Sequence, residues 1–114
     1  MSVTLAAFQS MIARTYHEKD GNRGIAGTIM WFTEEVGELA RALKRGTPDE
    51  DNLLMEFGDV LAWLATLANL AGIYLDAASR RYMDGCPRCR QAPCACGEAT
   101  RFQTLAPRPT SRPS

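Results

Sequence analysis

Two acidic pairs set in apolar helical sequence constrain the fold of this chain more than any other feature. Glu35 and Glu38 form the first pair, and Glu56 and Asp59 form the second. Residues three positions apart share one face of a helix, so each pair presents two carboxylates on the same side. Residues 53–75 contain no other charged residue and therefore no Lys or Arg. Because an unpaired buried carboxylate costs several kcal/mol, the pattern favours a bound divalent cation.

Length and charge exclude some classes of partner. The chain has 114 residues, enough for one domain with a modest core, and its hydrophobic fraction of 46% is ordinary for a globular protein. Thirteen basic and thirteen acidic residues cancel, but residues 1–100, without the arginines of the tail, carry a net charge of −3. Such a charge offers no electrostatic footprint for nucleic acid or an anionic membrane, and we expect neither as a partner.

The sequence also predicts a cytoplasmic protein. Residues 1–5 show no basic segment leading into an apolar core, so no signal peptide is expected. The uncharged run Val60–Leu75 has 16 residues, whereas a membrane span needs about 20. We therefore interpret this run as a buried core helix.

Hydrophobic periodicity predicts an all-α fold, because no alternating β-branched run and no hairpin dipeptide occurs between apolar segments. Gly21–Gly24 should separate the first two helices. Thr47 is the expected cap at the start of the third helix, and Gly72 is its expected end. The predicted helices cover about residues 2–17, 26–44, 48–71 and 75–82.

The short link from Lys44 to Asp49 favours antiparallel packing of the second and third helices, which would bring both acidic pairs to one point. The third helix is apolar on nearly every side, so a subunit interface is expected to cover part of it. We predict an antiparallel bundle of about four helices, completed as a homodimer or homotetramer. The predicted domains are an all-α domain at 1–84, a Cys-rich knuckle at 85–98 and a disordered tail at 99–114.

The acidic residues also suggest a chemistry. Carboxylate oxygens suit a hard cation such as Mg²⁺ or Mn²⁺, and two such ions could clamp a polyphosphate and activate a water. Glu34 lies on the same side of its helix as Glu38 and could act as the general base. The alternative for Glu34 is a surface acid paired with a nearby cation such as Arg41.

The order and spacing of these acids resemble a known signature. Glu34-Glu35-x-x-Glu38, followed after 17 residues by Glu56-x-x-Asp59, is similar to the EExxE…ExxD signature of MazG-like nucleotide pyrophosphohydrolases, an all-α group. The resemblance implies Mg²⁺-dependent hydrolysis of a nucleoside triphosphate between its α- and β-phosphates, giving the monophosphate and pyrophosphate. It implies that Glu34 is the base or a second-metal ligand, and that dimerisation completes the site. The implied magnesium ligands are Glu35, Glu38, Glu56 and Asp59.

Aromatic and basic residues near the acids are candidates for substrate binding. Trp31 lies one turn before the first acidic pair and Trp63 one turn after the second, so either could stack on a base. Core packing is the alternative for both. Arg81 is favoured as a phosphate ligand because similar proteins carry a basic residue after the third helix; a solvated surface charge is the alternative. The other cations considered are Lys19, Arg23 and Arg80.

Four cysteines form a separate motif, C-x₂-C-x₄-C-x-C, made of Cys86, Cys89, Cys94 and Cys96. Thiolates at these intervals could close a tetrahedral Zn²⁺ site, although the x₄ gap is short. Free or redox-active thiols and a disulfide are the alternatives. If the acids bind no catalytic metal, the chain could instead be a non-enzymatic helical interaction module with this knuckle as a zinc-stabilised docking element.

Overall fold

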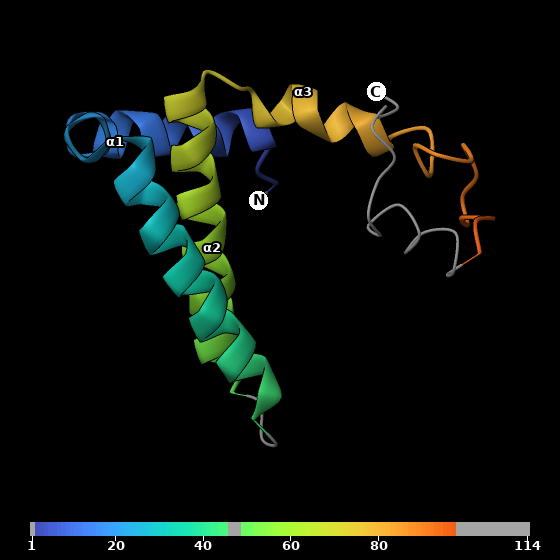
Figure 1. Cartoon of the computed structure of the whole chain (residues 1–114), viewed down its shortest axis with the longest axis horizontal. Coiled ribbons are helices and arrows are strands. Elements are labelled where there is room, and N and C mark those ends of the chain that lie inside the picture. The colour runs from blue at the N-terminus through green and yellow to red at the C-terminus, as the bar shows by residue number, and fades with distance from the viewer. Residues whose placement is uncertain (1, 46–48, 98–114) are drawn as a thin grey trace, which may run out of the picture. The chain divides into compact units, whose positions relative to one another are not determined.

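The computed structural model describes residues 2–45 and 49–97, and these residues are all-helical apart from turns and loops. Helix α1 spans Leu5–Lys44, α2 spans Glu50–Ala71, α3 spans Leu75–Ser79, and the 3₁₀ turn η1 spans Arg80–Tyr82 (Figure 1). The described residues contain no strand, which confirms the all-α prediction. They form three α-helices rather than a four-helix bundle within one chain.

Helix α1 is kinked at Gly24, and the first helix is longer than predicted. Helical structure continues beyond His17 to Arg23, and the interruption is confined to Gly24, whose φ of 77° and ψ of 176° are non-helical. A side chain is strained at positive φ, so glycine is the residue that suits this corner. Gly21, expected to share in the break, stays helical.

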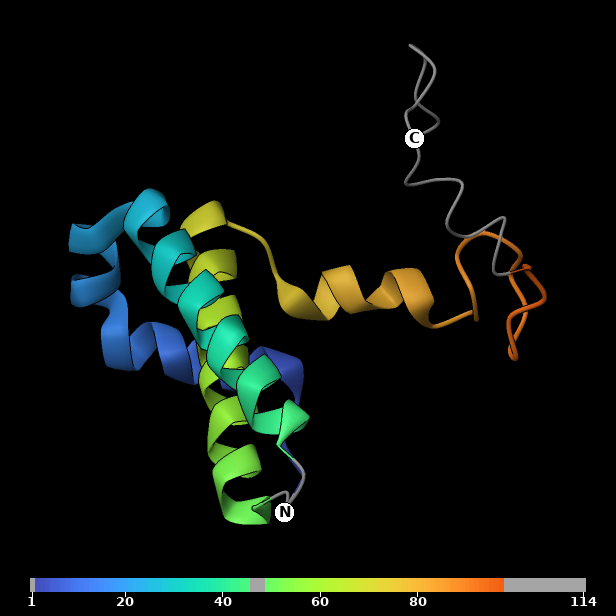
Figure 2. The same ribbon diagram turned by 60° about the horizontal axis from the view of Figure 1, so that its bottom comes forward.

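The segment 25–44 of α1 and helix α2 lie side by side and run in opposite directions, as both views show (Figures 1 and 2). This is the antiparallel packing predicted for the second and third helices. It places the N-terminal half of α2, which carries Glu56, beside the part of α1 that carries Glu35 and Glu38.

A buried polar network joins the kink of α1 to α2. Arg23 donates hydrogen bonds from Nη1 to Asp20 Oδ1 at 3.0 Å and to Thr28 Oγ1 at 3.1 Å. The Thr28 hydroxyl donates to the Gly24 carbonyl at 2.7 Å, and the Thr66 hydroxyl of α2 donates to Asp20 Oδ2 at 3.0 Å. Asp20, Thr28 and Thr66 are all buried. The network therefore fixes the register of α2 against α1.

A second network holds the other end of α2. Gln9, which is buried, donates to Asn69 Oδ1 at 3.0 Å and to the Ile73 carbonyl at 2.7 Å. Its Oε1 accepts from the Leu75 amide at 2.8 Å, at the start of α3. Between Asn69 and Leu75, Gly72 ends α2, as predicted, and it adopts the left-handed conformation with φ 71°. The first half of α1 thus positions both the end of α2 and the turn into α3.

The start of α2 differs from the prediction. Asp49 is the N-cap, and its carboxylate accepts hydrogen bonds from the amides of Asp51 at 3.1 Å and Asn52 at 3.3 Å. An aspartate next to the first turn satisfies two free amides directly, so it takes the capping role expected of Thr47. Thr47 itself lies outside the described residues.

Much apolar surface is left exposed by the first unit. Val36 and Leu43 of α1 are 40% and 53% exposed. Helix α2 is long and apolar enough to cross a membrane by length and composition alone, with a mean hydropathy of 1.4, and only 17% of that stretch is buried. The core helix of a soluble protein can pass the same test. Further exposed apolar side chains are Met30, Leu54, Met55 and Phe57.

The described residues form two compact units, one ending at Ala78 and one beginning at Ser79. The second contains η1 and the loop that carries the cysteines. Gly85 adopts φ 98° there, and a Cβ on it would lie 2.8 Å from the Gln91 carbonyl. The domain limits predicted at 84 and 98 stay predictions, and the predicted disordered tail at 99–114 lies outside the described residues.

We expect Asp20→Ala to destabilise the protein by about 2–3 kcal/mol, because it removes the ion pair of Arg23 and leaves the buried Thr66 hydroxyl without its acceptor. Urea unfolding followed by circular dichroism at one protein concentration measures the change. The exposed acid Glu18 on the same helix supplies the control, and Glu18→Ala should stay within about 0.5 kcal/mol of the wild type. Equal effects of the two substitutions would show that the network does not stabilise the kink.

Candidate functional site

Three of the predicted carboxylates converge between α1 and α2. Glu35 and Glu38 from α1 and Glu56 from α2 each place a carboxylate oxygen within 4.8 Å of the other two, and all three are half-buried. Opposite ligands of one Mg²⁺ ion lie about 4.2 Å apart, since each Mg–O distance is about 2.1 Å. Small side-chain adjustments would therefore let these oxygens bind a single ion.

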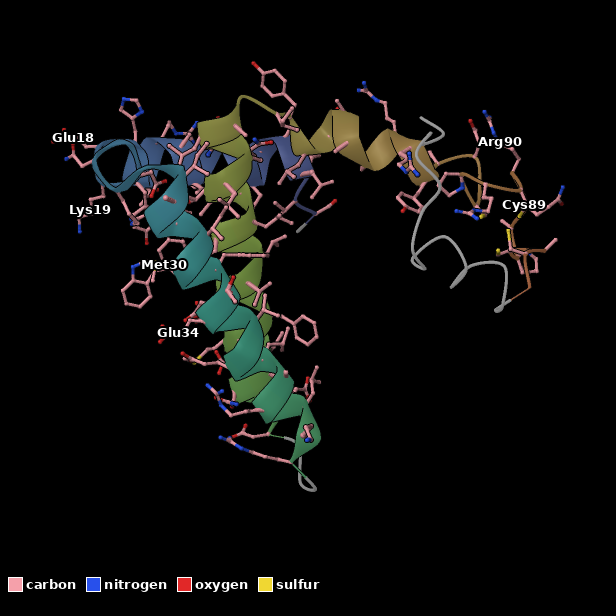
Figure 3. The ribbon with its side chains drawn as sticks, in the orientation of Figure 1. Glu18, Lys19, Met30, Glu34, Cys89 and Arg90 are labelled. Atoms are coloured by element: carbon pink, nitrogen blue, oxygen red, sulfur yellow. The ribbon has the colours of Figure 1, made fainter. Side chains whose placement is uncertain are left out.

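The other two predicted acids lie at the edge of this cluster. Asp59 and Glu34 are both exposed, and neither is among the three converging carboxylates. Both are near enough for their negative charges to contribute to the raised pKa of Glu35. Glu34 projects from the same side of α1 as Met30 (Figure 3). The structure thus brings three of the five acids together and leaves two beside them.

The cluster is electrostatically unfavourable as it stands. Partial burial raises the pKa of Glu35 above its ordinary value of 4.5, and the charges of Glu38, Asp59 and Glu56 raise it further. None of the three converging carboxylates forms an ion pair with a Lys or Arg of residues 2–45 and 49–97. A cation of high charge is the group that would relieve this repulsion.

Both tryptophans lie in one stack that the sequence did not reveal. The rings of Trp31 and Trp63 are nearly parallel, with centroids 6.2 Å apart and an interplanar angle of 11°. The Arg23 guanidinium lies 4.8 Å from the centroid of Trp63. Arg23, considered as a phosphate ligand, is therefore held by Asp20, Thr28 and Trp63. No local signal could have indicated this, because Trp63 lies 40 positions from Arg23 in the chain.

Arg81, the favoured phosphate ligand, belongs to the second unit. Its guanidinium lies 5.8 Å from the centroid of the Tyr82 ring, and the residue is exposed. Together with Arg80 and Arg90, it lines a hollow of about 310 Å³ whose other walls include Asp84. Lys19 is exposed on the first half of α1 (Figure 3).

The four cysteines converge in the second unit. Their sulfur atoms lie within 4.8 Å of one another, with Cys86 Sγ 4.0 Å from Cys96 Sγ and Cys89 Sγ 3.9 Å from Cys94 Sγ. All four are free thiols. A hydrogen bond from the Ala95 amide lowers the pKa of Cys89 to about 6, whereas loss of hydration, together with the neighbouring thiols, raises the pKa of Cys96 to about 12. The short x₄ gap does not prevent convergence.

The acids and the tryptophans all lie inside one region of similarity to known proteins. Residues 23–88 match the family described as the MazG nucleotide pyrophosphohydrolase domain. This protein belongs to that family. The match spans more than half of the chain and confirms the resemblance drawn from the acidic signature. It ends at Arg88, so three of the four cysteines lie beyond it.

A curated relative is consistent with this assignment. The chain is 37% identical over 73 residues to the uncharacterized protein YpjD of Bacillus subtilis (strain 168). The alignment covers 57% of this chain and 66% of the relative, so the chain spans just under two thirds of that protein's length.

The raised pKa of Glu35 predicts a pH-dependent stability in the absence of divalent metal. The folded state holds a proton more tightly than the unfolded state, so the free energy of unfolding should fall as the pH rises from 4.5 through the raised pKa. Glu35→Gln cannot ionise and should lose less stability over this range. Urea unfolding in EDTA at a series of pH values measures the difference, and added Mg²⁺ should reduce it.

The matched control is Glu18→Gln, which removes an exposed carboxylate outside the cluster and should follow the wild-type profile. If the free energies of unfolding of Glu35→Gln and the wild type changed in parallel from pH 4.5 to neutrality, the pKa of Glu35 would not be raised by the cluster.

Proposed function

We propose that this protein hydrolyses nucleoside triphosphates between the α- and β-phosphates in a Mg²⁺-dependent reaction, releasing the nucleoside monophosphate and pyrophosphate. The observation that carries the proposal is the convergence of Glu35, Glu38 and Glu56 from two helices within a MazG nucleotide pyrophosphohydrolase domain. Deoxynucleotides and ribonucleotides are both in the proposed substrate class.

The proposed metal ligands are the three converging carboxylates together with Asp59, whose charge contributes to the raised pKa of Glu35. An oxygen-only donor set fits Mg²⁺ or Mn²⁺ better than a softer ion. When bound, the ion would neutralise phosphate charge and favour ionisation of a water. The carboxylates would hold it in place and would lose their mutual repulsion.

Glu34 is the proposed general base. It is exposed beside the cluster and is not among the three converging carboxylates, so its oxygens are free to accept a proton from the attacking water. The water oxygen forms a bond to one phosphorus of the α–β anhydride while the bridging bond breaks. The electron pair of that bond leaves on the departing phosphate group, and the proton passes to Glu34.

Trp31 and Arg81 are the proposed substrate-binding residues. Trp31 is 50% exposed and contacts Trp63 on one face of its ring, which leaves ring surface for a nucleotide base. Arg81 is an exposed cation in a hollow lined by two other arginines and by Asp84, and three cations against one acid leave a positive charge that suits phosphate oxygens.

A second copy of this chain is the proposed cover for the exposed apolar surface of the first unit. Met55 is 66% exposed and Leu54 is 65% exposed, both in the first half of α2, and Met30 of α1 is 73% exposed. Exposed apolar surface of this extent is typical of a protein that associates. The expected assembly is a cytoplasmic homodimer or homotetramer, without nucleic acid or membrane as a partner.

A product assay tests the reaction. Incubation with common nucleoside triphosphates and Mg²⁺, followed by ion-exchange chromatography, should yield monophosphate and pyrophosphate in equal amounts, and EDTA should stop turnover. Loss of a group that only supports a metal ligand costs about 10–100-fold in activity. Glu38→Gln and Asp59→Asn remove proposed ligands and should each lower kcat by more than about 100-fold.

The controls are Glu18→Gln on α1 and Asp51→Asn on α2, which neutralise exposed acids outside the cluster and should keep wild-type activity. Nucleoside diphosphate and orthophosphate as products would contradict the proposed bond. Full activity of Glu38→Gln would contradict the proposed site.

Size-exclusion chromatography with light scattering tests the assembly. The wild type should have about two or four times the chain mass of 12.5 kDa. Met55→Glu places a charge on the exposed apolar surface and should shift the protein toward the monomer, whereas His17→Glu, at an exposed polar position, should not. A monomeric wild type, or binding of the wild type to lipid vesicles, would contradict this proposal.

A further inference from the structure

The cysteine loop of the second unit has the geometry of a closed metal site. In a tetrahedral site with Zn–S distances of about 2.3 Å, neighbouring sulfurs lie about 3.8 Å apart. The Cys86–Cys96 and Cys89–Cys94 sulfur pairs lie at 4.0 and 3.9 Å, and all four sulfurs lie within 4.8 Å of one another. The four thiols therefore already surround a point that one ion could occupy.

Backbone amides point at three of the four sulfurs. The Arg88 amide donates to Cys86 Sγ at 3.4 Å, the Ala95 amide donates to Cys89 Sγ at 3.3 Å, and the Cys96 amide donates to Cys94 Sγ at 3.3 Å. Such bonds stabilise the charged thiolate, which is the form that binds metal. The loop therefore directs backbone N–H donors at three of the four sulfurs that would surround a metal.

The backbone closes the loop independently of the sulfurs. The Cys86 amide donates to the Gln91 carbonyl at 3.0 Å, and the Arg90 amide donates to the Cys86 carbonyl at 2.6 Å. Gly85 makes this closure possible, since a Cβ there would lie 2.8 Å from the Gln91 carbonyl. These backbone bonds hold the turn between the first two cysteines and the last two. The main chain therefore brings the four thiols close together.

The charges of the loop residues also favour a zinc tetrathiolate site. Four thiolates around one Zn²⁺ ion carry a net charge of −2, and Arg88 and Arg90 within the loop supply two positive charges. Four ligands with no open position make a structural site rather than a catalytic one. Within its described residues, 79–97, the second unit has the short turn η1 and no long helix to build a core, so a metal would supply the stability that burial does not.

We propose that Cys86, Cys89, Cys94 and Cys96 bind one Zn²⁺ ion as a tetrathiolate structural site. Three of these residues lie beyond the region that matches the MazG family, so the site is additional to the catalytic domain. The proposal does not depend on the proposed hydrolase activity, because the sulfur and carboxylate clusters share no residue.

Elemental analysis and X-ray absorption of the full chain test this proposal. Protein purified from zinc-supplemented medium, without chelators, should contain one zinc per chain, and the zinc edge should show four sulfur neighbours at about 2.3 Å. Cobalt exchanged into the site should give the intense visible bands of a tetrahedral thiolate complex. Both spectroscopic measurements use the wild type, so they do not depend on whether a variant folds.

Cys89→Ser should remove most of the bound zinc, while Gln91→Ala, which keeps the backbone bond that closes the loop, should retain one zinc per chain. The proposal is overturned by zinc well below one per chain, by oxygen or nitrogen neighbours in place of sulfur, by iron as the bound metal, or by cysteines paired as disulfides in protein prepared under reducing conditions.

Discussion

The arrangement of the first unit depends on a buried carboxylate at the kink of α1. Asp20 accepts a hydrogen bond from Arg23 on its own helix and another from Thr66 on α2, so one side chain joins both elements. Arg23 would stay with this carboxylate in any register of α2, but another register would take the Thr66 hydroxyl away from its second oxygen. Gly24 turns the chain beside this group. The register that results brings Glu56 to the acids of α1.

That register of α2 against α1 places three negatively charged carboxylates close together. Three carboxylates converge without an ion pair to a Lys or Arg of the described residues, and the raised pKa of Glu35 reflects partial burial and their mutual repulsion. The helices hold these acids together because their packing and the polar network lie elsewhere, around Asp20 and Gln9. A site built in this way favours binding of a divalent cation, since the ion removes an existing penalty as well as forming new bonds.

The two units are stabilised by different interactions. The first buries polar networks and small residues such as Ala65 between long helices, but leaves apolar side chains on both helices exposed. The described part of the second, residues 79–97, has no long helix, and its thiols converge within a loop closed by backbone hydrogen bonds. Association of chains and binding of a metal are thus two separate proposed additions to a small fold, since neither unit buries a large core alone.

The sequence by itself determined the helical class, the end of α2 at Gly72 and the pairing of acids on shared faces, because period, glycine stops and i,i+3 spacing are local properties. It did not reveal that Arg23 is held beside Trp63, or that Asp59 lies outside the three converging carboxylates. The tertiary structure alone decided those points. Contacts between residues 40 or more positions apart follow from how two helices align, and that alignment is set by buried partners that no local pattern encodes.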